Sequence, residues 1–357
     1  MKIAIIGTVG VPASYGGFET LVENLIEDDT VCFTVYCSGQ HYSERKPVYK
    51  NANLIYLPLS ANGVQSVIYD IWSILLALFS GHKHLLILGT SGAVVLPLVR
   101  LFCRHVNIVI NIDGLEWKRQ KWKGFAKQFL KFSERLAVKF SSVVVADNAA
   151  IAKHIQSNYN AVCETIAYGG DHALIDKTLV PTVETAIGKE AYAFALCRIE
   201  PENNVHVILD AFSSSKMNLI FVGNWQASDY GRSLVELHSS NSNIDLLDPI
   251  YDLHTLALYR AHCNVYVHGH SAGGTNPSLV EMMHFDKPIV AFDCVYNRAT
   301  MEDKGLYFSS ASSLSLILDD SNFGGNGSEL GDIARRRYTW SVVRAQYGKL
   351  FDLELRG

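Results

Sequence analysis

The chain has 357 residues, of which 48% are hydrophobic and 18% are charged, and its formal net charge at pH 7 is -4. This is the composition of a globular protein long enough to form two domains, and it excludes a largely disordered chain. The near balance of charges gives no support for a nucleic-acid partner, because such proteins usually carry a strongly basic domain.

Several features of the sequence bear on cellular location. The seven cysteines are scattered, with no pair at the spacing of metal or redox motifs, and are expected to be reduced core residues of a cytosolic protein. The N-terminal MKIAIIGTVGVP lacks the longer apolar region and cleavage site of a secretory signal. The longest apolar stretch, residues 64–80, spans about 17 residues and contains Asp70, so it predicts a helix buried on one side and not a membrane span.

From the N-terminus, short apolar strands alternate with segments of helical periodicity. Strands are predicted at residues 2–7, 33–38, 53–59, 84–89, 106–112 and 141–147. Helices are predicted at residues 16–29, 64–80 and 92–103, after Trp117, and from Asn148 to about Tyr159. Strands that are apolar throughout and joined by helices indicate a parallel sheet covered on both faces.

A second series of the same kind occupies the C-terminal half. Its strands are predicted at residues 191–199, 218–223, 243–248, 264–269 and 288–293. The boundary is expected near residues 168–171, where a short strand gives way to glycines. The sequence therefore predicts two doubly wound α/β domains, residues 1–168 and 169–357. Ligands of open parallel sheets bind beyond the carboxyl ends of the strands, so the functional residues are sought there.

The loop between the first strand and the first helix, Gly7–Glu19, is rich in glycine and contains Gly16 and Gly17. Its backbone can approach a ligand closely, and free N–H groups at a helix start suit a phosphate or sugar oxygen. Glycines also occur in such turns for steric reasons alone. A dinucleotide site is not indicated, because the spacing is not GxGxxG and the second strand ends in Cys37 and Ser38 instead of an acidic residue.

A second loop of small residues, from His268 to Asn276, leads into a helix with Pro277 in its first turn. Glu281 is expected about one turn inside this helix, where its carboxylate can accept two hydrogen bonds from a ribose diol. The alternative is an acid that is favoured near a helix start by the helix dipole. His268 and His270 are two residues apart, but no nearby acid or cysteine completes a metal site.

The segment GGTNPSLVE, from Gly273 to Glu281, resembles the donor loop of the retaining GT-B glycosyltransferases of family 4. Glu281 matches the second glutamate of their motif, and Gly273 stands where the first usually is. Together with the motif YGGFET at residues 15–20, the motif GGTNPSLVE resembles the sequences of a bacterial subgroup of rhamnosyltransferases of capsule, cell-wall and O-antigen synthesis. The resemblance covers nearly the whole chain. It implies two Rossmann-like domains facing a cleft, with an N-terminal acceptor side, a C-terminal nucleotide-sugar side, and a last helix that can return to the N-terminal domain.

In family 4 the first strand of the C-terminal domain ends in an arginine, followed five residues later by a lysine, and both contact the donor pyrophosphate. Arg198 fits the first role, and Asn203 occupies the lysine position. The planar fork of an arginine suits a phosphate, although an ion pair with Glu200 or Glu202 is the alternative. Without the lysine, backbone N–H groups of the second loop are expected to hold more of the diphosphate. The donor-binding residues expected on this basis are Gly16, Gly17, Arg198, Asn203, His270, Gly273, Gly274, Thr275, Asn276 and Glu281.

The sequence contains no Asp-x-Asp, the pair with which glycosyltransferases of the other common fold hold a divalent ion. Neither a metal nor a cofactor is therefore expected, and Arg198 and helix N-termini would stabilise the departing nucleotide. At strand ends of the N-terminal domain, Asp113 or Asp147 can accept the proton of the attacking hydroxyl, and Asp113 is preferred. The alternatives are an Asp-Gly turn at Asp113 and a helix cap at Asp147.

Cations and aromatic residues are interleaved in the segment that follows Asp113. Its residues expected to contact the acceptor or a membrane are Glu116, Trp117, Lys118, Arg119, Lys121 and Trp122. Such a stretch suits anionic lipid headgroups, and a solvated helix face with ordinary core aromatics is the alternative.

Taken together, these patterns favour transfer of L-rhamnose from dTDP-L-rhamnose to a lipid-linked saccharide, by a cytoplasmic enzyme bound peripherally to the inner face of the cytoplasmic membrane. A UDP-hexose donor is the nearest alternative. A non-hydrolysing nucleotide-sugar epimerase shares the architecture but needs no acceptor. A bilobal sugar-binding protein is disfavoured by the lack of a secretion signal and by the two phosphate-type loops.

Overall fold

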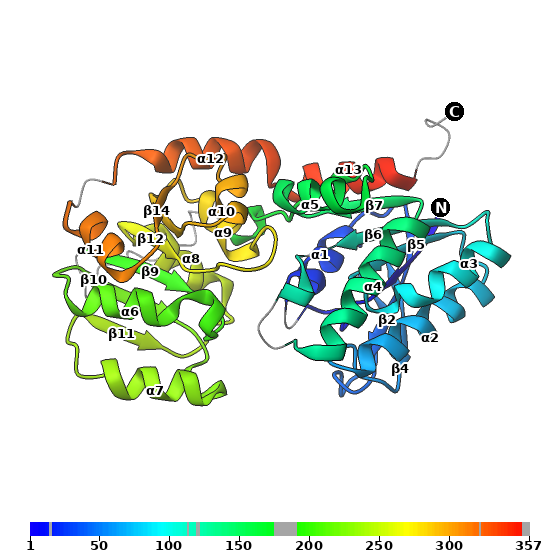
Figure 1. Ribbon diagram of the computed structural model, residues 1–357, viewed down its shortest axis with the longest axis horizontal. Helices are drawn as coiled ribbons and strands as arrows, with labels where there is room; N and C mark the ends of the chain where they lie inside the picture. Colours follow the sequence, from blue (N-terminus) through cyan, green and yellow to red (C-terminus); the bar gives the residue numbers. More distant parts are fainter. Residues whose placement is uncertain (14–15, 113, 119–121, 175–190, 321–322, 352–357) are drawn as a thin grey trace. The chain divides into compact units, whose positions relative to one another are not determined.

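The computed structural model describes residues 1–13, 16–112, 114–118, 122–174, 191–320 and 323–351. The chain divides into two compact units (Figure 1). Unit 1 comprises Met1–Tyr168 together with the segment that begins at Trp340, and unit 2 comprises Gly169–Thr339. Each unit is built on a sheet of mainly parallel strands with helices between them, so the predicted doubly wound α/β class is confirmed.

Unit 1 contains an eight-stranded sheet in the order β3-β4-β2-β1-β5-β6-β7-β8. All neighbours pair in parallel except β3 and β4, which are antiparallel. The central strands are apolar along their whole length and buried, which is why they form the middle of the sheet. The strands are β1 (Lys2–Ile6), β2 (Cys32–Ser38), β3 (Val48–Tyr49), β4 (Ala52–Leu57), β5 (His84–Leu88), β6 (Asn107–Ile112), β7 (Val143–Ala146) and β8 (Glu164–Thr165).

Helices connect these strands and cover the sheet. They are α1 (Gly17–Leu25), α2 (Gln65–Phe79), α3 (Leu96–Phe102), α4 (Gly124–Phe140) and α5 (Ala149–Tyr159), with short 3₁₀ helices η1 (Ser91–Val95) and η2 (Glu116–Lys118). Right-handed crossovers put α1 on one face and α2 to α5 on the other. The last helix, α13 (Trp340–Phe351), packs beside α1, and Arg344 Nη1 lies 3.0 Å from Glu27 Oε2.

Unit 2 contains a six-stranded, fully parallel sheet in the order β11-β10-β9-β12-β13-β14. Its strands are β9 (Tyr192–Leu196), β10 (Asn218–Val222), β11 (Ile244–Leu247), β12 (Val265–His268), β13 (Ile289–Phe292) and β14 (Leu306–Phe308). Its helices are α6 (Val205–Ser213), α7 (Asp229–His238), α8 (Leu253–His262), α9 (Pro277–Met283), α10 (Val295–Thr300), α11 (Ala311–Asp320) and α12 (Asn326–Arg337), with 3₁₀ helices η3 (Asp171–Ala173), η6 (Pro201–Asn203) and η7 (Trp225–Ala227). Aliphatic and aromatic side chains from the strands and from α6 form a buried core against one face of the sheet.

Two observed strands, β3 and β14, are absent from the sequence prediction, whereas β8 lies where a short strand is expected before the glycines at the domain boundary. Each is only two or three residues long and lies at or beside the edge of a sheet. A strand this short carries no period of alternation, so only its pairing with a neighbour identifies it.

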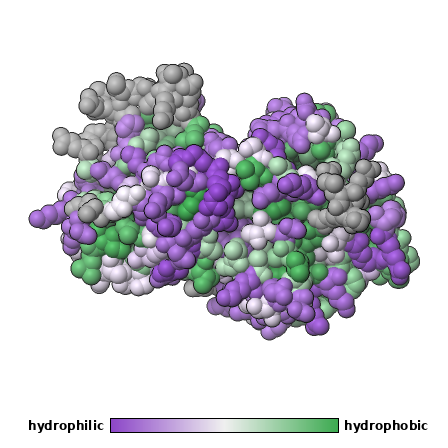
Figure 2. Space-filling model, turned by 90° about the horizontal axis from the view of Figure 1, so that it is seen from above, coloured by the Kyte–Doolittle hydropathy of each residue, from purple (hydrophilic) through white to green (hydrophobic). Residues whose placement is uncertain are grey.

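The surface shown in Figure 2 mixes hydrophilic and hydrophobic residues, as globular surfaces usually do. Across the described part of the chain, no helix is both long and apolar enough to cross a membrane. The predicted helix at residues 64–80 is present as α2, and it buries one side, formed by Tyr69, Asp70, Ser73, Ile74 and Ala77.

Candidate functional site

The order in which strands are added to the sheet of unit 2 reverses at β9: β10 and β11 follow on one side of it, and β12, β13 and β14 on the other. Strand β9 pairs with β10 on one side and with β12 on the other, so the loops after β9 and β12 leave the sheet toward opposite faces. Ligands of doubly wound sheets bind at such a switch point, beyond the carboxyl ends of the strands. The candidate site of unit 2 is therefore the pair of loops that begin at Cys197 and Gly269.

These two loops are joined by hydrogen bonds. Asn204 Nδ2 donates to the carbonyl of Gly269 at 2.8 Å, and Ser271 Oγ donates to the carbonyl of Glu202 at 2.7 Å. A Cβ atom on Gly269 would lie 2.1 Å from the carbonyl oxygen of Asn203, so no side chain fits at this position. The loops consequently form one rigid platform at the switch point.

Arg198 and Asn203 both lie in the first loop but in different settings. The Arg198 side chain is exposed, and its Nη1 lies 3.5 Å from Glu200 Oε1. This is one of the two ion pairs expected as alternatives from the sequence, and an exposed pair of this kind contributes about 0–1 kcal/mol. Asn203 is buried, and its Nδ2 donates to the carbonyl of Arg198 at 2.7 Å. The Asn203 amide thus fixes the backbone that carries Arg198.

The loop before α9 combines an open backbone with a firm helix cap. Gly273 has a φ of +108°, which disfavours any other residue, and a Cβ there would have no neighbour within 4 Å. Asn276 Oδ1 accepts hydrogen bonds from Ser278 N at 3.1 Å and from Ser278 Oγ at 2.8 Å. Pro277 occupies the first turn of α9, as predicted. A glutamate at position 273, as in the motif that the sequence resembles, would be strained in this backbone.

Glu281 lies inside α9 and is engaged by an arginine and a histidine side chain. Arg260 Nη2 from α8 forms an ion pair with Glu281 Oε2, and His172 Nε2 from η3 lies 3.4 Å from Glu281 Oε1. The side chains of Arg260 and Glu281 are only 3% and 14% exposed. Burial by itself raises the pKa of the Glu281 carboxyl, but the charge of Arg260 and the bond from His172 outweigh it, and the net pKa is lowered. Glu281 is therefore held ionised and fixed in position.

Sequence reasoning missed Arg260 and His172. A signal for Arg260 exists, because it follows Leu256 and Ala257 at helical spacing on the buried side of α8. A charged residue at a core position of a helix requires a partner, since an unpaired buried charge is very costly. Arg260 Nη1 is also buried, and no hydrogen-bond partner is present for it among the described residues. No comparable signal marks His172.

The two histidines of the second loop stack on each other. The ring centroids of His268 and His270 are 4.5 Å apart, with an angle of 16° between the planes. Burial lowers the pKa of His268 to about 3, so this ring is neutral at physiological pH. Among the described residues, no cluster of three or more His, Cys, Asp or Glu side chains could hold a metal ion.

In the glycine-rich loop of unit 1, backbone N–H groups donate hydrogen bonds to side chains of the protein itself. Val9 N donates to Glu19 Oε1 at 2.8 Å, and Thr8 Oγ1 donates to the same oxygen at 3.0 Å. Ala13 N donates to Glu23 Oε2 at 2.5 Å. Burial raises the pKa of the Glu19 carboxyl, while its hydrogen bonds work in the opposite direction. Two carboxylates of α1 that contact this loop disfavour a phosphate and leave sugar hydroxyls as the better match.

Of the two predicted proton acceptors, Asp113 and Asp147, the structure describes only Asp147. Asp113 lies outside the described residues. Asp147 is buried at the carboxyl end of β7, and the cap of α5 is formed by Asn148, whose Oδ1 accepts from Ala150 N at 2.9 Å. Asn148 therefore caps α5, and capping by Asp147, the alternative expected from the sequence, is not observed.

The basic aromatic segment is partly tied into unit 1. Trp117 Nε1 donates to Glu134 Oε2 at 2.9 Å, and the ammonium of Lys131 lies 4.4 Å from the Trp117 ring centroid. Trp122 Nε1 donates to Glu116 Oε1 at 2.8 Å. Lys118 is exposed, whereas Arg119 and Lys121 lie outside the described residues. Trp117 therefore serves packing against α4 in this structure.

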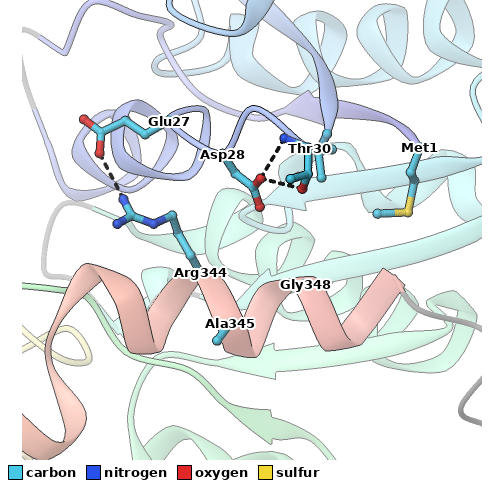
Figure 3. Close-up of a pocket in the computed structure, with 8 residues that line it drawn as sticks. Met1, Glu27, Asp28, Thr30, Arg344, Ala345 and Gly348 are labelled. Carbon is cyan, nitrogen blue, oxygen red and sulfur yellow. Dashed lines mark hydrogen bonds and ion pairs between the residues drawn. The ribbon is translucent and has the colours of Figure 1, made fainter.

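A pocket of about 720 Å³ opens at another place in unit 1 (Figure 3). Its lining consists of Met1, Glu27, Asp28, Thr30 and Val31, together with Arg344, Ala345 and Gly348 of α13. Met1 and Val31 directly precede β1 and β2, so this pocket lies at the amino ends of the strands. It is at the opposite edge from the one at which doubly wound sheets bind their ligands.

Comparison with known families agrees with the position of the unit 2 site. Residues 177–308 match the family described as "Glycosyl transferases group 1". This part of the chain is similar to a group 1 glycosyltransferase domain. The match spans β9 to β14 and hence the switch point with Arg198 and Glu281, and it supports a glycosyltransferase. Residues 1–171 match a domain of unknown function, DUF1972. No curated protein matches the chain.

Solved structures of glycosyltransferases share the fold over the full length. Sucrose-phosphate synthase from Thermosynechococcus elongatus has a TM-score of 0.82 at 15% identity, with 99% of each chain covered. HepE from Anabaena in complex with UDP has a TM-score of 0.75 at 15% identity, covering 98% of this chain and 99% of HepE. A glycosyltransferase from Rickettsia africae has a TM-score of 0.71 at 10% identity, covering 100% and 99%. The predicted GT-B fold is thereby confirmed.

Proposed function

We propose that this chain is a retaining, metal-independent glycosyltransferase that transfers L-rhamnose from dTDP-L-rhamnose to a lipid-linked saccharide in capsule, cell-wall or O-antigen synthesis. The observation that carries the proposal is the group 1 domain, whose matched residues include the switch-point loops of unit 2. A nucleotide-sugar donor is further supported by HepE, which has been solved with UDP and with UDP-glucose. The choice of rhamnose depends on the motifs YGGFET and GGTNPSLVE.

In this proposal the donor lies on the platform formed by the two loops of unit 2. The Arg198 guanidinium neutralises charge that grows on the diphosphate as the glycosidic bond breaks. Backbone N–H groups of residues 273–275 bind the phosphates, and the ionised Glu281 accepts hydrogen bonds from the ribose. Asn203 acts as a positioning residue, because its amide holds the carbonyl of Arg198.

The acceptor is proposed to bind on unit 1. Its attacking hydroxyl gives its proton to Asp113, with Asp147 as the second candidate. Gly16 and Gly17, expected from the sequence to bind the donor, lie at the start of α1, and the carboxylates of Glu19 and Glu23 beside them favour sugar hydroxyl groups over phosphates. The cations of the segment from Lys118 to Lys123 are proposed to meet anionic headgroups at the inner face of the cytoplasmic membrane, where a lipid-linked acceptor resides.

A UDP-hexose donor is the second candidate. It is favoured by the similarity in fold to HepE, which has been solved with UDP-glucose. The two donors differ in the base and in the sugar, whereas the platform contacts named above involve the ribose and the diphosphate.

The first experiment is a thermal-shift screen of the intact protein with dTDP, UDP and GDP. It is followed by turnover assays with dTDP-L-rhamnose and UDP-glucose, in the presence and absence of a lipid-linked saccharide. Stabilisation by dTDP and acceptor-dependent release of dTDP would support the proposal. Isomerisation of the sugar without an acceptor would show an epimerase instead, and stabilisation by UDP alone would select the UDP-hexose donor.

A further inference from the structure

The outer side of α2 exposes large apolar side chains along its whole length. Residues spaced three or four apart form this stripe, beginning at the residue that precedes the helix: Val64, Ile68, Trp72, Leu75 and Phe79. Their exposed fractions range from 38% to 87%. The opposite side of the helix is buried in unit 1 and contains the one charged residue of α2, Asp70. A surface helix of a globular protein normally presents polar residues to water, so this stripe requires another explanation.

A second group of exposed apolar residues lies on α3. Leu98, Leu101 and Phe102 of α3 are each more than half exposed. Helices α2, α3 and α4 all pack around η1, and Figure 1 shows them on the same side of the sheet of unit 1. We call these eight residues of α2 and α3, including Val64, the apolar face. An apolar area spread over two adjacent helices is larger than the isolated exposed residues that occur on most surfaces.

The charges around the apolar face have one sign. Between residues 45 and 112 the sequence contains a single acidic residue, the buried Asp70. Lys83 and Arg104 are exposed just beyond the C-terminal ends of α2 and α3. On α4, Arg135 and Lys139 are exposed, as is Lys123 at its start, whereas the one acid of that helix, Glu134, is buried and bonded to Trp117 and Tyr159. Exposed cations therefore lie on α4 and just beyond the ends of α2 and α3, in a chain whose net charge is negative.

We propose that the apolar face enters the headgroup region of a bilayer that contains anionic lipids, with α2 and α3 lying along the membrane surface and the surrounding cations contacting the headgroups. The combination of an apolar stripe with a basic border is the pattern of interfacial helices, and Trp72 suits the boundary between lipid and water. This assignment rests on the proposed lipid-linked acceptor. It moves the inserting residues away from Trp117, whose indole is bound to Glu134.

The test compares the wild type with the variant Ile68→Gln/Leu75→Gln/Phe79→Gln. All three residues are exposed, so the change should leave folding intact, and circular dichroism and a thermal melt check this. The matched control is Leu237→Gln/Leu316→Gln, which removes exposed leucines from unit 2. Binding is measured by flotation with vesicles of phosphatidylcholine, with and without phosphatidylglycerol.

We expect the wild type and the control to float with the anionic vesicles and the stripe variant to lose about tenfold or more in partitioning. Added salt should weaken wild-type binding, because the cationic border acts through screened charges. Equal partitioning of the stripe variant and wild type, or no vesicle binding by wild type, would overturn the proposal. So would a wild-type dimer in light scattering that the stripe variant abolishes, since the face would then join two copies of the chain.

Turnover of a soluble acceptor analogue separates this proposal from the proposed function. The stripe variant should keep that turnover, because no residue of the apolar face belongs to the proposed donor or acceptor site. If the wild type turns over the soluble acceptor but does not bind vesicles, the proposed transferase function stands and the proposed membrane surface is wrong. If the wild type binds vesicles but transfers sugar to no acceptor, the proposed membrane surface stands and the proposed reaction is wrong.

Discussion

Replacement of Glu281 by glutamine tests both the packing of unit 2 and the proposed donor site. From sequence alone, loss of Glu281 is expected to weaken donor binding and to leave the fold intact, because no large core cavity opens. The structure adds a second consequence, since Arg260 is buried and forms an ion pair with this carboxylate. Glutamine keeps the shape of the side chain and removes only its charge.

The expected loss of stability is large. Removing one partner of a buried ion pair costs about 3–5 kcal/mol, because the other charge stays buried without compensation. For a domain of the size of unit 2, each kcal/mol lowers Tm by about 2–4 °C, so Tm should fall by roughly 6–20 °C. His172 cannot replace the lost charge, as it is itself a partner of the carboxylate.

The effect should depend on pH in a defined direction. The pKa of Glu281 is lowered in the folded state from an ordinary value of 4.5, so the stabilisation by its charge is complete above that value. It is lost as the pH falls through the lower folded pKa. The difference in unfolding free energy between wild type and Glu281→Gln should therefore be constant near neutral pH and shrink in acid.

Nucleotide binding by calorimetry completes the assay. Loss of a charged hydrogen bond to the ribose should weaken dTDP binding by roughly 10- to 100-fold. Arg260→Met should destabilise unit 2 while leaving the carboxylate in place, and the double variant Arg260→Met/Glu281→Gln should regain stability but not affinity. A Glu281→Gln protein with unchanged stability would refute the role of the ion pair. A folded variant with unchanged affinity would leave Glu281 a structural residue.

Three further predictions address other residues. Turnover should fall in Arg198→Lys and further in Arg198→Ala, mainly in kcat, while Tm hardly changes because the pair with Glu200 is exposed; retained activity with lost stability would contradict this. EDTA should leave turnover nearly intact, because the sequence has no Asp-x-Asp, and a loss restored by magnesium or manganese would show the opposite. Burial raises the pKa of Asp70 to about 7, so the contribution of Asp70 to the unfolding free energy should decline as the pH rises from about 4 to about 7. In urea titrations the difference in unfolding free energy between wild type and Asp70→Asn should therefore fall over this range, and a constant difference would show that Asp70 does not titrate there.

The sequence by itself determined the local elements of this protein and the order in which they occur. Apolar runs such as the one that forms β5 have no polar side to present to water, so they indicate central parallel strands before any contact is known. Asn276 and Pro277 likewise set the start of α9 through local hydrogen bonding and a fixed backbone angle. The short edge strands β3 and β14 could not be predicted, because pairing alone defines them.

The tertiary structure decided which distant groups meet. Local periodicity places Glu281 on a helix but does not reveal that Arg260, on another helix, neutralises it. It shows that α2 is apolar on nearly all sides, yet only packing decides which of its faces remains exposed. The glycines after β1 suggest a free anion site from sequence, whereas the fold brings Glu19 and Glu23 onto their neighbours' N–H groups. The physical reason is one of range: backbone preferences act over a few residues, whereas burial and charge pairing depend on contacts between segments far apart in the chain.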